Sequence, residues 1–407
     1  MTRPWDLVLF GATGFTGRQA AAYLHAHAPE GVTWAVAGRN EAKLKAVVDG
    51  LGPEVGVEVV DGADAAAVTR LASSARVIAS TAGPFARYSD LLAKACAEQG
   101  THYCDITGES PWVASLVARD HDAAKASGAR IVPMCGFDSI PSDLGVWMMA
   151  KHLSEAHDER TSEVITAFGG GAAGLNGGTL ASAILMAESG QRSKLANPAL
   201  LMPADQRPEG RLASAPQSLL QHDVLGQLGP FVMAPINTQV VYRSVALARG
   251  ASADPSRFAS DFRYAEYLRH PSRGRAVMVT LGLAVADQLL QRGWGRGLLR
   301  RFGPAPGEGP SEAAMDAANT TCRFVATGSG GATAYGRMFC PGDAGNRATV
   351  LMLCEAALCM VQDRFAHADG GVLTPSVALG QGLMDRLRAA GMLWEASDTP
   401  EVLSLRR

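Results

Sequence analysis

Residues 6–17 read DLVLFGATGFTG, in which a short apolar run leads into glycines at positions 11, 14 and 17. The run is typical of a buried parallel strand, and a helical pattern follows it to about Ala28. Glycines allow the tight turn and close backbone approach that a diphosphate needs, and a helix start offers N–H groups and a positive dipole end. We therefore expect a dinucleotide to contact Gly11, Ala12, Thr13, Gly14, Phe15 and Thr16. The alternative is an ordinary tight turn between strand and helix.

The alternation of strand and helix continues to about Asp138. Five further strands are predicted at 33–37, 55–60, 76–80, 101–106 and 130–134, with helical patterns between them. Strands joined by right-handed helical crossovers make an α/β fold with a doubly wound parallel sheet of the Rossmann type. Ligands bind beyond the carboxyl ends of such strands, so the loops after the first, second, fourth and sixth strands are the candidate sites.

The loop after the second strand bears on the choice of cofactor. Sites for NAD place an acidic residue there for the ribose hydroxyls, whereas this chain has Arg39 and, one turn later, Lys43. A guanidinium can pair with a 2′-phosphate and stack on adenine. We therefore expect NADP(H), bound by Gly38, Arg39, Asn40 and Lys43. The alternative is that Arg39 and Lys43 are solvated surface charges.

Two further loops would lie near the nicotinamide half of such a cofactor. Ala82, Gly83 and Pro84 follow the fourth strand. Cys135, Gly136 and Phe137 follow the sixth strand. Both triplets are predicted to bind the cofactor, and each could instead be a simple turn.

Three side chains on these loops are candidates for catalysis. A reductase needs a proton source and donors for the electron density that hydride transfer creates. Tyr88, Glu109 and Asp138 could fill these roles. Alternatively Tyr88 is a packed or surface tyrosine, and Glu109, with Asp105, caps the helix that begins near Pro111. Asp138 could also orient the nicotinamide, with Ser139 as an N-cap, and His102 within the fifth strand is expected to be structural.

Composition excludes several classes of protein. The 407 residues are 47% hydrophobic and 19% charged, which excludes global disorder and predicts two or three domains. The formal net charge is -2, whereas a nucleic-acid-binding protein usually carries an excess of positive charge. Seven scattered cysteines without a CxxC pair argue against a disulfide framework and a thiolate metal site, so we expect no metal. The start of the chain and the length of its apolar runs predict a soluble, cytoplasmic protein.

The pattern changes after about residue 145. Strands of a second sheet are predicted at 163–168, 238–247 and 323–327, with helices at 178–188, 347–361 and 377–390. Exposed loops are expected at 197–216 and 304–310. On the strand at 238–247, Tyr242 and Arg243 could contact a substrate oxygen.

An apolar run at 276–290 is followed directly by Arg292, Trp294 and Arg296. An apolar helix with a basic, Trp-bearing end could touch a membrane surface peripherally or dock an acidic carrier protein. The favoured alternative is a buried helix with a solvated basic end.

The chain resembles the saccharopine dehydrogenase-like oxidoreductases, and most closely the bacterial branch that includes trans-acting enoyl reductases. The segments that carry the resemblance span nearly the whole chain: 11–17, 37–40, 82–88, 95–109, 134–145, 177–182, 306–311, 342–349 and 370–380. The resemblance implies a Rossmann domain over 1–144, an α+β substrate and dimerisation domain over 145–344, and C-terminal helices over 345–407 that return to the first domain. It supports a nicotinamide cofactor without a metal and, by analogy, a homodimer.

These observations favour an NADPH-dependent oxidoreductase that transfers hydride to the C=C bond of an apolar, acyl-type enoyl substrate, free or carrier-bound. One alternative is a saccharopine-type enzyme that reduces or forms a C=N bond on an amino-acid conjugate. Another is a dinucleotide-binding, lipid-associated scaffold without turnover, which would lack a shielded substrate cavity beside the nicotinamide.

Overall fold

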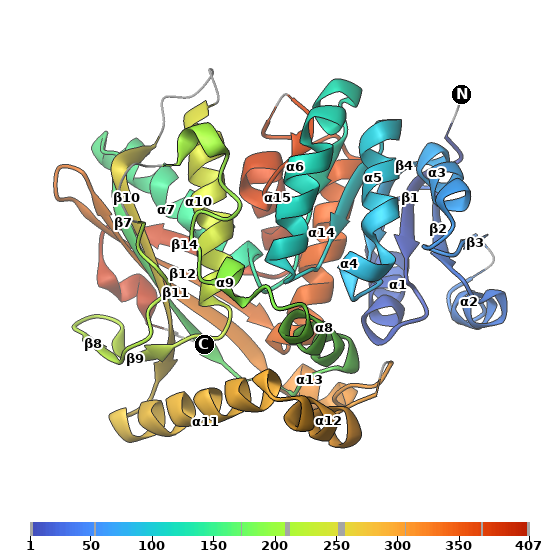
Figure 1. Cartoon of the computed structure of the whole chain (residues 1–407). Coiled ribbons are helices and arrows are strands. Elements are labelled where there is room, and N and C mark those ends of the chain that lie inside the picture. Colours follow the sequence, from blue (N-terminus) through green and yellow to red (C-terminus); the bar gives the residue numbers. More distant parts are fainter. Residues whose placement is uncertain are drawn as a thin grey trace.

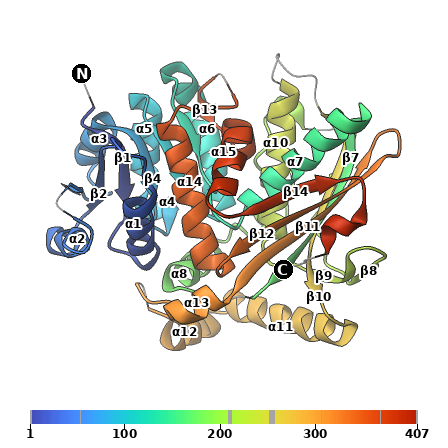
Figure 2. The same cartoon turned by 180° about the vertical axis from the view of Figure 1, so that it is seen from behind.

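A computed structural model describes residues 3–52, 54–171, 173–207, 212–250, 257–305, 307–367 and 369–404. Parts of the loops expected at 197–216 and 304–310 lie outside these residues. Two seven-stranded sheets lie beside each other, with helices packed against both (Figures 1 and 2). The first sheet is built from the N-terminal part of the chain and from one short strand near the C-terminus. The second sheet is built from the rest of the chain.

The first sheet is parallel and has the strand order β13-β6-β5-β4-β1-β2-β3. Its strands are β1 (Trp5–Phe10), β2 (Trp34–Gly38), β3 (Gly56–Val59), β4 (Ala75–Ser80), β5 (His102–Asp105), β6 (Arg130–Val132) and β13 (Gly371–Val372). The doubly wound Rossmann sheet predicted from the sequence is thereby confirmed. The order reverses between β1 and β4, and a crevice for a ligand is expected at that point. Strand β13 was not predicted, because two residues carry no periodicity.

Helices cover both faces of this sheet. They are α1 (Phe15–His27), α2 (Glu41–Val48), α3 (Ala65–Ser74), α4 (Phe85–Tyr88), α5 (Asp90–Gln99) and α6 (Ser110–Ser127). Alternate residues of β1 face the two sides of the sheet and belong to two hydrophobic cores. Leu7 and Leu9 pack with α1 and the C-terminal helix α14, whereas Val8 and Phe10 pack with α3 and α5. This alternation is the period of two of an extended strand.

The C-terminal segment returns to the first sheet. Helix α14 (Thr349–Val361) follows a π-helical turn, η2 (Ala344–Ala348), and every residue of α14 is buried. Within the described residues, Ala344–Val361 is the single stretch long and apolar enough to cross a membrane, and 83% of it is buried inside the protein, as in a core helix. The predicted return of the C-terminal helices is confirmed. Helix α15 (Pro375–Ala389) packs on α14 and on α7.

Helix α7 (Ile140–His157) passes without a break across the expected domain boundary at 144 and leads into the second sheet. That sheet is mixed and has the order β14-β12-β11-β7-β10-β9-β8. Its strands are β7 (Thr161–Gly170), β8 (Leu220–His222), β9 (Gly226–Pro230), β10 (Phe258–His270), β11 (Asn319–Gly328), β12 (Thr333–Pro341) and β14 (Leu393–Ser397). The strands predicted at 163–168 and 323–327 are present.

The strand predicted at 238–247 is wrong, because these residues lie in helix α10 (Ala234–Gly250). Residues 236–246 are all buried, polar and apolar alike, so the run shows no helical period and resembles a buried strand. Tyr242 and Arg243 are each 2% exposed. The guanidinium of Arg243 donates to the carbonyls of Leu201 and Val372, so Arg243 joins structural segments.

The remaining helices cover the second sheet and its edges: α8 (Gly177–Glu188), α9 (Arg192–Leu195), η1 (Ala204–Gln206), α11 (Arg273–Gln291), α12 (Gly293–Phe302), α13 (Glu312–Ala317) and η3 (Pro400–Leu403). The helix expected over the apolar run at 276–290 is α11. Its burial was predicted wrongly, since Ala276 is its one buried residue.

Candidate active site

The glycines of the first loop have two different roles. Gly11 has φ +86°, and a Cβ there would lie 2.8 Å from the backbone nitrogen of Ala82. At Gly17 a Cβ would lie 2.2 Å from the carbonyl oxygen of Gly11. At Gly14 the nearest atom would be the carbonyl oxygen of Gly11 at 3.4 Å, which is an ordinary contact, so that position can accept a Cβ. Gly11 and Gly17 therefore close the turn, and Gly14 leaves room in front of it.

The room left at Gly14 is at the N-terminus of α1, where no side chain caps the helix. A negatively charged group is favoured there by the helix dipole and by the N–H groups of the first turn. The residues present thus fit a dinucleotide diphosphate. Arg39 and Lys43 are exposed at the end of β2, and the structure records no polar partner for either side chain within the described chain. Asn40 has another role, since its side chain accepts from the backbone N–H of Lys43 at 3.0 Å and caps α2.

Segments far apart in sequence meet at the start of α1. Arg18 donates to the carbonyls of Thr13 and Gly307, at 2.8 and 3.2 Å. A Cβ on Gly309 would lie 2.4 Å from the ring of Phe15. The N–H of Gly177, at the start of α8, donates to the carbonyl of Glu308 at 3.0 Å. The segment around 307–309 therefore lies over the start of α1 and links it to α8.

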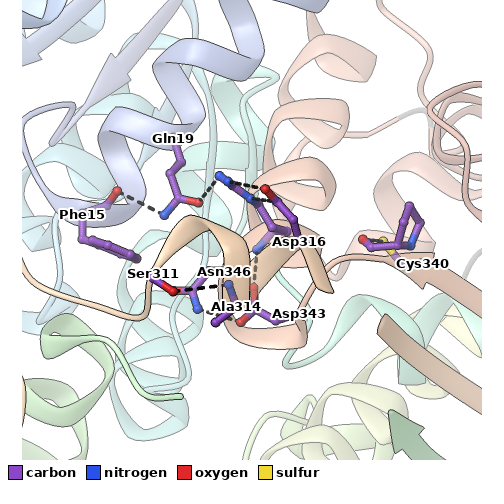
Figure 3. A network of polar contacts seen from close by, with 10 residues as sticks. Phe15, Gln19, Ser311, Ala314, Asp316, Cys340, Asp343 and Asn346 are labelled. Atoms are coloured by element: carbon purple, nitrogen blue, oxygen red, sulfur yellow. Dashed lines mark hydrogen bonds and ion pairs between the residues drawn. The ribbon is translucent and has the colours of Figure 1, made fainter. Parts of the chain in front are cut away.

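A polar network fastens the same region to the returning C-terminal segment (Figure 3). Arg347 pairs with Asp316 at 2.7 Å and with the side chain of Gln19 on α1 at 2.8 Å. Asn346 donates to Asp343 at 2.7 Å and accepts from Asn176, the N-cap of α8, at 2.9 Å. A groove of about 790 Å³ begins at Phe15 and runs along α1 beside this network. The start of α1 is thus held by the segments that precede α8 and α14.

Glu109 holds the loop after β4 in place. Its carboxylate is 3% exposed and accepts from the N–H groups of Phe85 and Ala86, at 2.9 and 3.0 Å, and from the hydroxyl of Ser182 at 2.9 Å. Glu109 occupies the N-cap position of α6 without capping it, and its side chain satisfies the start of α4 instead. The alternative that Glu109 caps the helix that begins near Pro111 is therefore wrong. The carboxylate positions Ala82, Gly83 and Pro84, which precede α4.

Tyr88 lies on the other side of that loop. A Cβ on Gly62, in the loop after β3, would come within 2.5 Å of the Tyr88 carbonyl oxygen. The guanidinium of Arg87 lies 5.2 Å from the centre of the Tyr88 ring. Since β3 is the far edge of the sheet from β6, the backbone of Tyr88 packs toward the β3 side rather than toward Asp138.

Asp138 follows β6 and has an unusual environment. A Cβ on Gly108 would lie 3.9 Å from its Oδ2, 3.7 Å from Cε of Met233 and 3.8 Å from Cδ1 of Ile236. The structure records no hydrogen bond or ion pair for its carboxylate within the described residues. Burial among apolar groups raises the pKa of Asp138 to about 6. A carboxyl with such a pKa can hold and release a proton near neutral pH.

Two other ionisable side chains, those of Asp105 and His102 on β5, have hydrogen-bond partners. Asp105 accepts from the N–H groups of Thr107 and Met134 and from the hydroxyl of Tyr103, although burial raises its pKa to about 7. His102 accepts from the N–H of Arg130, and burial lowers its pKa to about 4. These contacts fit the structural role expected of His102.

A buried polar chain runs beneath Asp138. Ser139 is at the N-cap position of α7 without a cap bond, and its hydroxyl donates to Asn237 at 3.1 Å. Asn237 donates to Glu266 at 2.8 Å, and Glu266 also accepts from Ser142 and Tyr264, at 2.7 Å each. Burial raises the pKa of Glu266 to about 7. The chain ties α7 to α10 and β10, so it fixes the position of the loop that carries Asp138.

The triplet after β6 is packed between secondary-structure elements. The thiol of Cys135 donates to the Val132 carbonyl, and burial raises its pKa. A Cβ on Gly136 would lie 3.2 Å from the Thr349 side chain. The ring of Phe137 packs edge-on against Phe168, which stacks on Phe231. The surroundings of Asp138 are therefore mostly apolar.

Several of these residues were missed from the sequence. Ser182, Met233, Ile236 and Asn237 lie 40 or more residues from the loops that they touch. No local pattern marks them, because tertiary packing alone brings them to the site. Away from this region, the described residues include one group that could hold a metal ion, in which Asp398 accepts from His152 and His157 at 2.8 Å each.

Comparisons with known proteins agree with this architecture. Residues 7–132 match the family model of the saccharopine dehydrogenase NADP binding domain. A trans-acting enoyl reductase of Mycobacterium ulcerans is 32% identical and aligns with 97% of this chain and 98% of its own. A Mycobacterium tuberculosis relative, provisionally named a trans-acting enoyl reductase, is 35% identical over 96% of this chain and 97% of its own.

Two solved structures share the fold over nearly the whole chain. Saccharopine dehydrogenase (L-Glu forming) of Saccharomyces cerevisiae has a TM-score of 0.53 at 11% identity, and covers 97% of this chain and 99% of its own. Homospermidine synthase of Legionella pneumophila, solved with NAD, has a TM-score of 0.54 at 10% identity, and covers 98% and 92%. At such identities the likeness shows the fold alone.

Proposed function

The chain belongs to the trans-acting enoyl reductase family of saccharopine dehydrogenase-like, NADP-dependent oxidoreductases, and from this premise we propose that it reduces the C=C bond of an apolar enoyl thioester. The observation that carries the proposal is Asp138, a carboxyl without a recorded polar partner that lies among apolar side chains at the carboxyl end of the sheet. The substrate is a small, lipophilic acyl compound, free or carrier-bound.

The cofactor is held by the loops at the carboxyl ends of β1, β2, β4 and β6. The open face of Gly14 and the start of α1 accommodate the diphosphate, and Arg39 and Lys43 offer positive charge to a 2′-phosphate. Glu109 acts as a positioning residue, because it fixes the loop 82–84 through the N–H groups of Phe85 and Ala86. Bound NADPH supplies the hydride that adds to the β-carbon of the enoyl group.

Asp138 supplies the proton. Hydride addition leaves electron density on the α-carbon and the thioester oxygen, and a proton on the α-carbon completes the saturated product. The raised pKa keeps part of the Asp138 population protonated near neutral pH. Solvent returns the proton to the carboxylate after product release.

The apolar setting supports an acyl substrate over an amino-acid conjugate. Met233, Ile236 and Asp138 all border Gly108, and neither Met233 nor Ile236 can bind the carboxylates of a saccharopine-like molecule. The guanidinium of Arg243, which is buried on the same helix, is engaged by the carbonyls of Leu201 and Val372. A carboxylate of such a substrate would therefore remain unpaired near these residues, which is costly.

The test is NADPH oxidation by the purified protein with enoyl thioesters of several chain lengths, on coenzyme A and on an acyl carrier protein. Turnover that rises with chain length, without activity on saccharopine, is expected. Turnover of saccharopine alone would replace the proposal with C=N chemistry. NADPH binding without turnover of any of these substrates would favour the scaffold. The homodimer and the cytoplasmic location stay predictions.

A further inference from the structure

Helices α11 and α12 form a layer along one edge of the molecule (Figures 1 and 2). Helix α11 is apolar over residues 276–290 apart from Thr280, Asp287 and Gln288. Val279, Leu283 and Leu290 are half-buried, whereas a second stripe is exposed to solvent: Val277 (41%), Met278 (60%), Leu281 (63%) and Val285 (60%). Large apolar side chains exposed along one helix in this way are normally covered by protein or by lipid.

Helix α12 continues this exposed surface with larger side chains. Trp294, Leu298 and Phe302 recur every fourth residue, so they share one face, and they are 63%, 50% and 75% exposed. The opposite face is fixed to the protein, because Arg296 and Arg300 pair with Glu188 of α8 at 3.3 and 2.8 Å. The apolar face of α12 is therefore held outward by ion pairs.

The layer carries strong positive charge. Residues 273–302 hold six arginines and one aspartate, a formal charge of +5 in a chain whose net charge is -2. Arg273, Arg275, Arg292 and Arg301 are exposed, and the structure records no ion pair for any of them within the described residues. Arg301 precedes Phe302 and its guanidinium lies 5.6 Å from the ring centre, so charge borders the apolar face directly.

We propose that the layer α11–α12 is a docking surface for an anionic membrane, on which the protein rests with both helices in the plane of the interface. Exposed apolar side chains with Trp and Phe among them, bordered by arginines that have no ion pair in the described part of the chain, match the composition of interfacial helices. The face is on helices at the outside of the fold, and so it suits a broad, flat partner. A second copy of the chain fits worse, because each copy would bring the same excess of arginine to the contact.

The surface lies next to the candidate active site. Helix α8 packs against α11, is joined to α12 by Glu188, and contacts Glu109 through Ser182. A membrane at this face would be separated from the cofactor loops by one helix. Binding to it does not depend on turnover, so the proposal can fail or hold independently of the proposed reaction.

The test is co-sedimentation of the full chain with vesicles of phosphatidylcholine, alone or mixed with phosphatidylglycerol. We expect binding that is about tenfold or more stronger with phosphatidylglycerol, and a blue shift of tryptophan fluorescence that Trp294→Phe removes. Leu281→Glu with Leu298→Glu should lower vesicle binding at least about tenfold. Arg292→Gln with Arg301→Gln should weaken it about fivefold per residue on the anionic vesicles alone.

Val59→Glu is the matched control, because Val59 is 52% exposed on β3 at the far edge of the first sheet. It should bind vesicles as the unsubstituted protein does, and circular dichroism checks that all variants fold. The proposal is overturned if the protein stays in solution with anionic vesicles, or if the Leu281→Glu pair binds them unchanged. It is also overturned if that pair abolishes only a dimer, or only the binding of an acidic acyl carrier protein.

Discussion

Asp138 is a carboxyl whose burial costs the fold stability. Its pKa is raised from 3.8 to about 6, so the folded state binds the proton more tightly than the unfolded chain does. The contribution of Asp138 to the free energy of unfolding therefore falls as pH rises from about 4 to about 6 and stays low above that range. A residue kept at such a cost without a recorded polar partner is a candidate for chemistry.

Asp138→Asn separates chemistry from stability. We expect kcat to fall about 100-fold or more, because an amide cannot donate the proton, while NADPH affinity is retained. The wild-type rate should decline above about pH 6, as the carboxyl loses its proton, and the variant should lose this decline. Stopped-flow rates across pH measure both, with Asp122→Asn, an exposed carboxylate on α6, as the control. Unchanged turnover in the variant would remove Asp138 from the reaction.

The same substitution should stabilise the protein at alkaline pH. Removing the desolvated charge gains at most about 3 kcal/mol above pH 6, since one pKa unit is worth about 1.4 kcal/mol, and less than that because Asp138 is partly exposed; it gains nothing below about pH 4. Urea unfolding at pH 5 and pH 8 measures the difference. Equal stability of both forms at each pH would mean that the carboxylate finds a partner in solution.

Arg39 is proposed to select NADPH over NADH. Arg39→Ala should weaken NADPH binding about tenfold to 100-fold and leave NADH binding nearly unchanged, because only NADPH presents a 2′-phosphate to the guanidinium. Fluorescence titration of both nucleotides measures the ratio. Arg70→Ala, at an exposed arginine of α3, is the control for general loss of positive charge. Equal losses for both nucleotides would exclude a role in recognition of the 2′-phosphate.

At the scale of elements, two glycines of the turn from β1 to α1 are expected to have different roles, Gly17 in folding and Gly14 in cofactor binding. Gly17→Ala should destabilise the protein, because its Cβ would lie 2.2 Å from a carbonyl oxygen of the same turn. Gly14→Ala should fold normally, because its Cβ has 3.4 Å of clearance, yet it fills the space in front of the turn and should weaken NADPH binding at least about tenfold. Thermal unfolding and nucleotide titration of the two variants distinguish the roles. Normal NADPH binding by Gly14→Ala would place the diphosphate elsewhere.

Sequence patterns predicted the elements whose signals are local. The turn at 11–17 is marked by its three glycines, and the strands of the first sheet are short apolar runs between helices, so the sequence predicted both. The buried helix α10 was read as a strand, because a run enclosed on all sides has no period. The exposure of α11 was missed for a related reason: an apolar helix has the same composition whether protein or lipid covers it. The contact between Ser182 and Glu109 could not be predicted from local sequence patterns, since 73 residues separate the two.

At the scale of the whole molecule, the first sheet is completed by the end of the chain. Helix α14 covers its face beside α1, and β13 pairs with β6. Tyr23 on α1 donates to Glu355 of α14 at 2.9 Å, and Arg347 reaches Gln19. Helix α1, which follows the glycine-rich turn, is thus supported by residues more than 300 positions away. Cofactor binding and the packing of the C-terminal segment should therefore stabilise each other.

A fragment that contains residues 1–158 should accordingly fail to form a native nucleotide-binding domain. It keeps the turn and all six N-terminal strands, but it exposes the sheet face that α14 buries with its 13 residues. We expect a molten or aggregating species that binds a hydrophobic dye, shows no cooperative thermal transition and does not bind NADPH. Coexpression of the fragment with residues 340–407 should partly restore the transition, because α14 and β13 supply the missing face. A cooperative transition with NADPH binding in the isolated fragment would show that the Rossmann sheet folds without the returning helices.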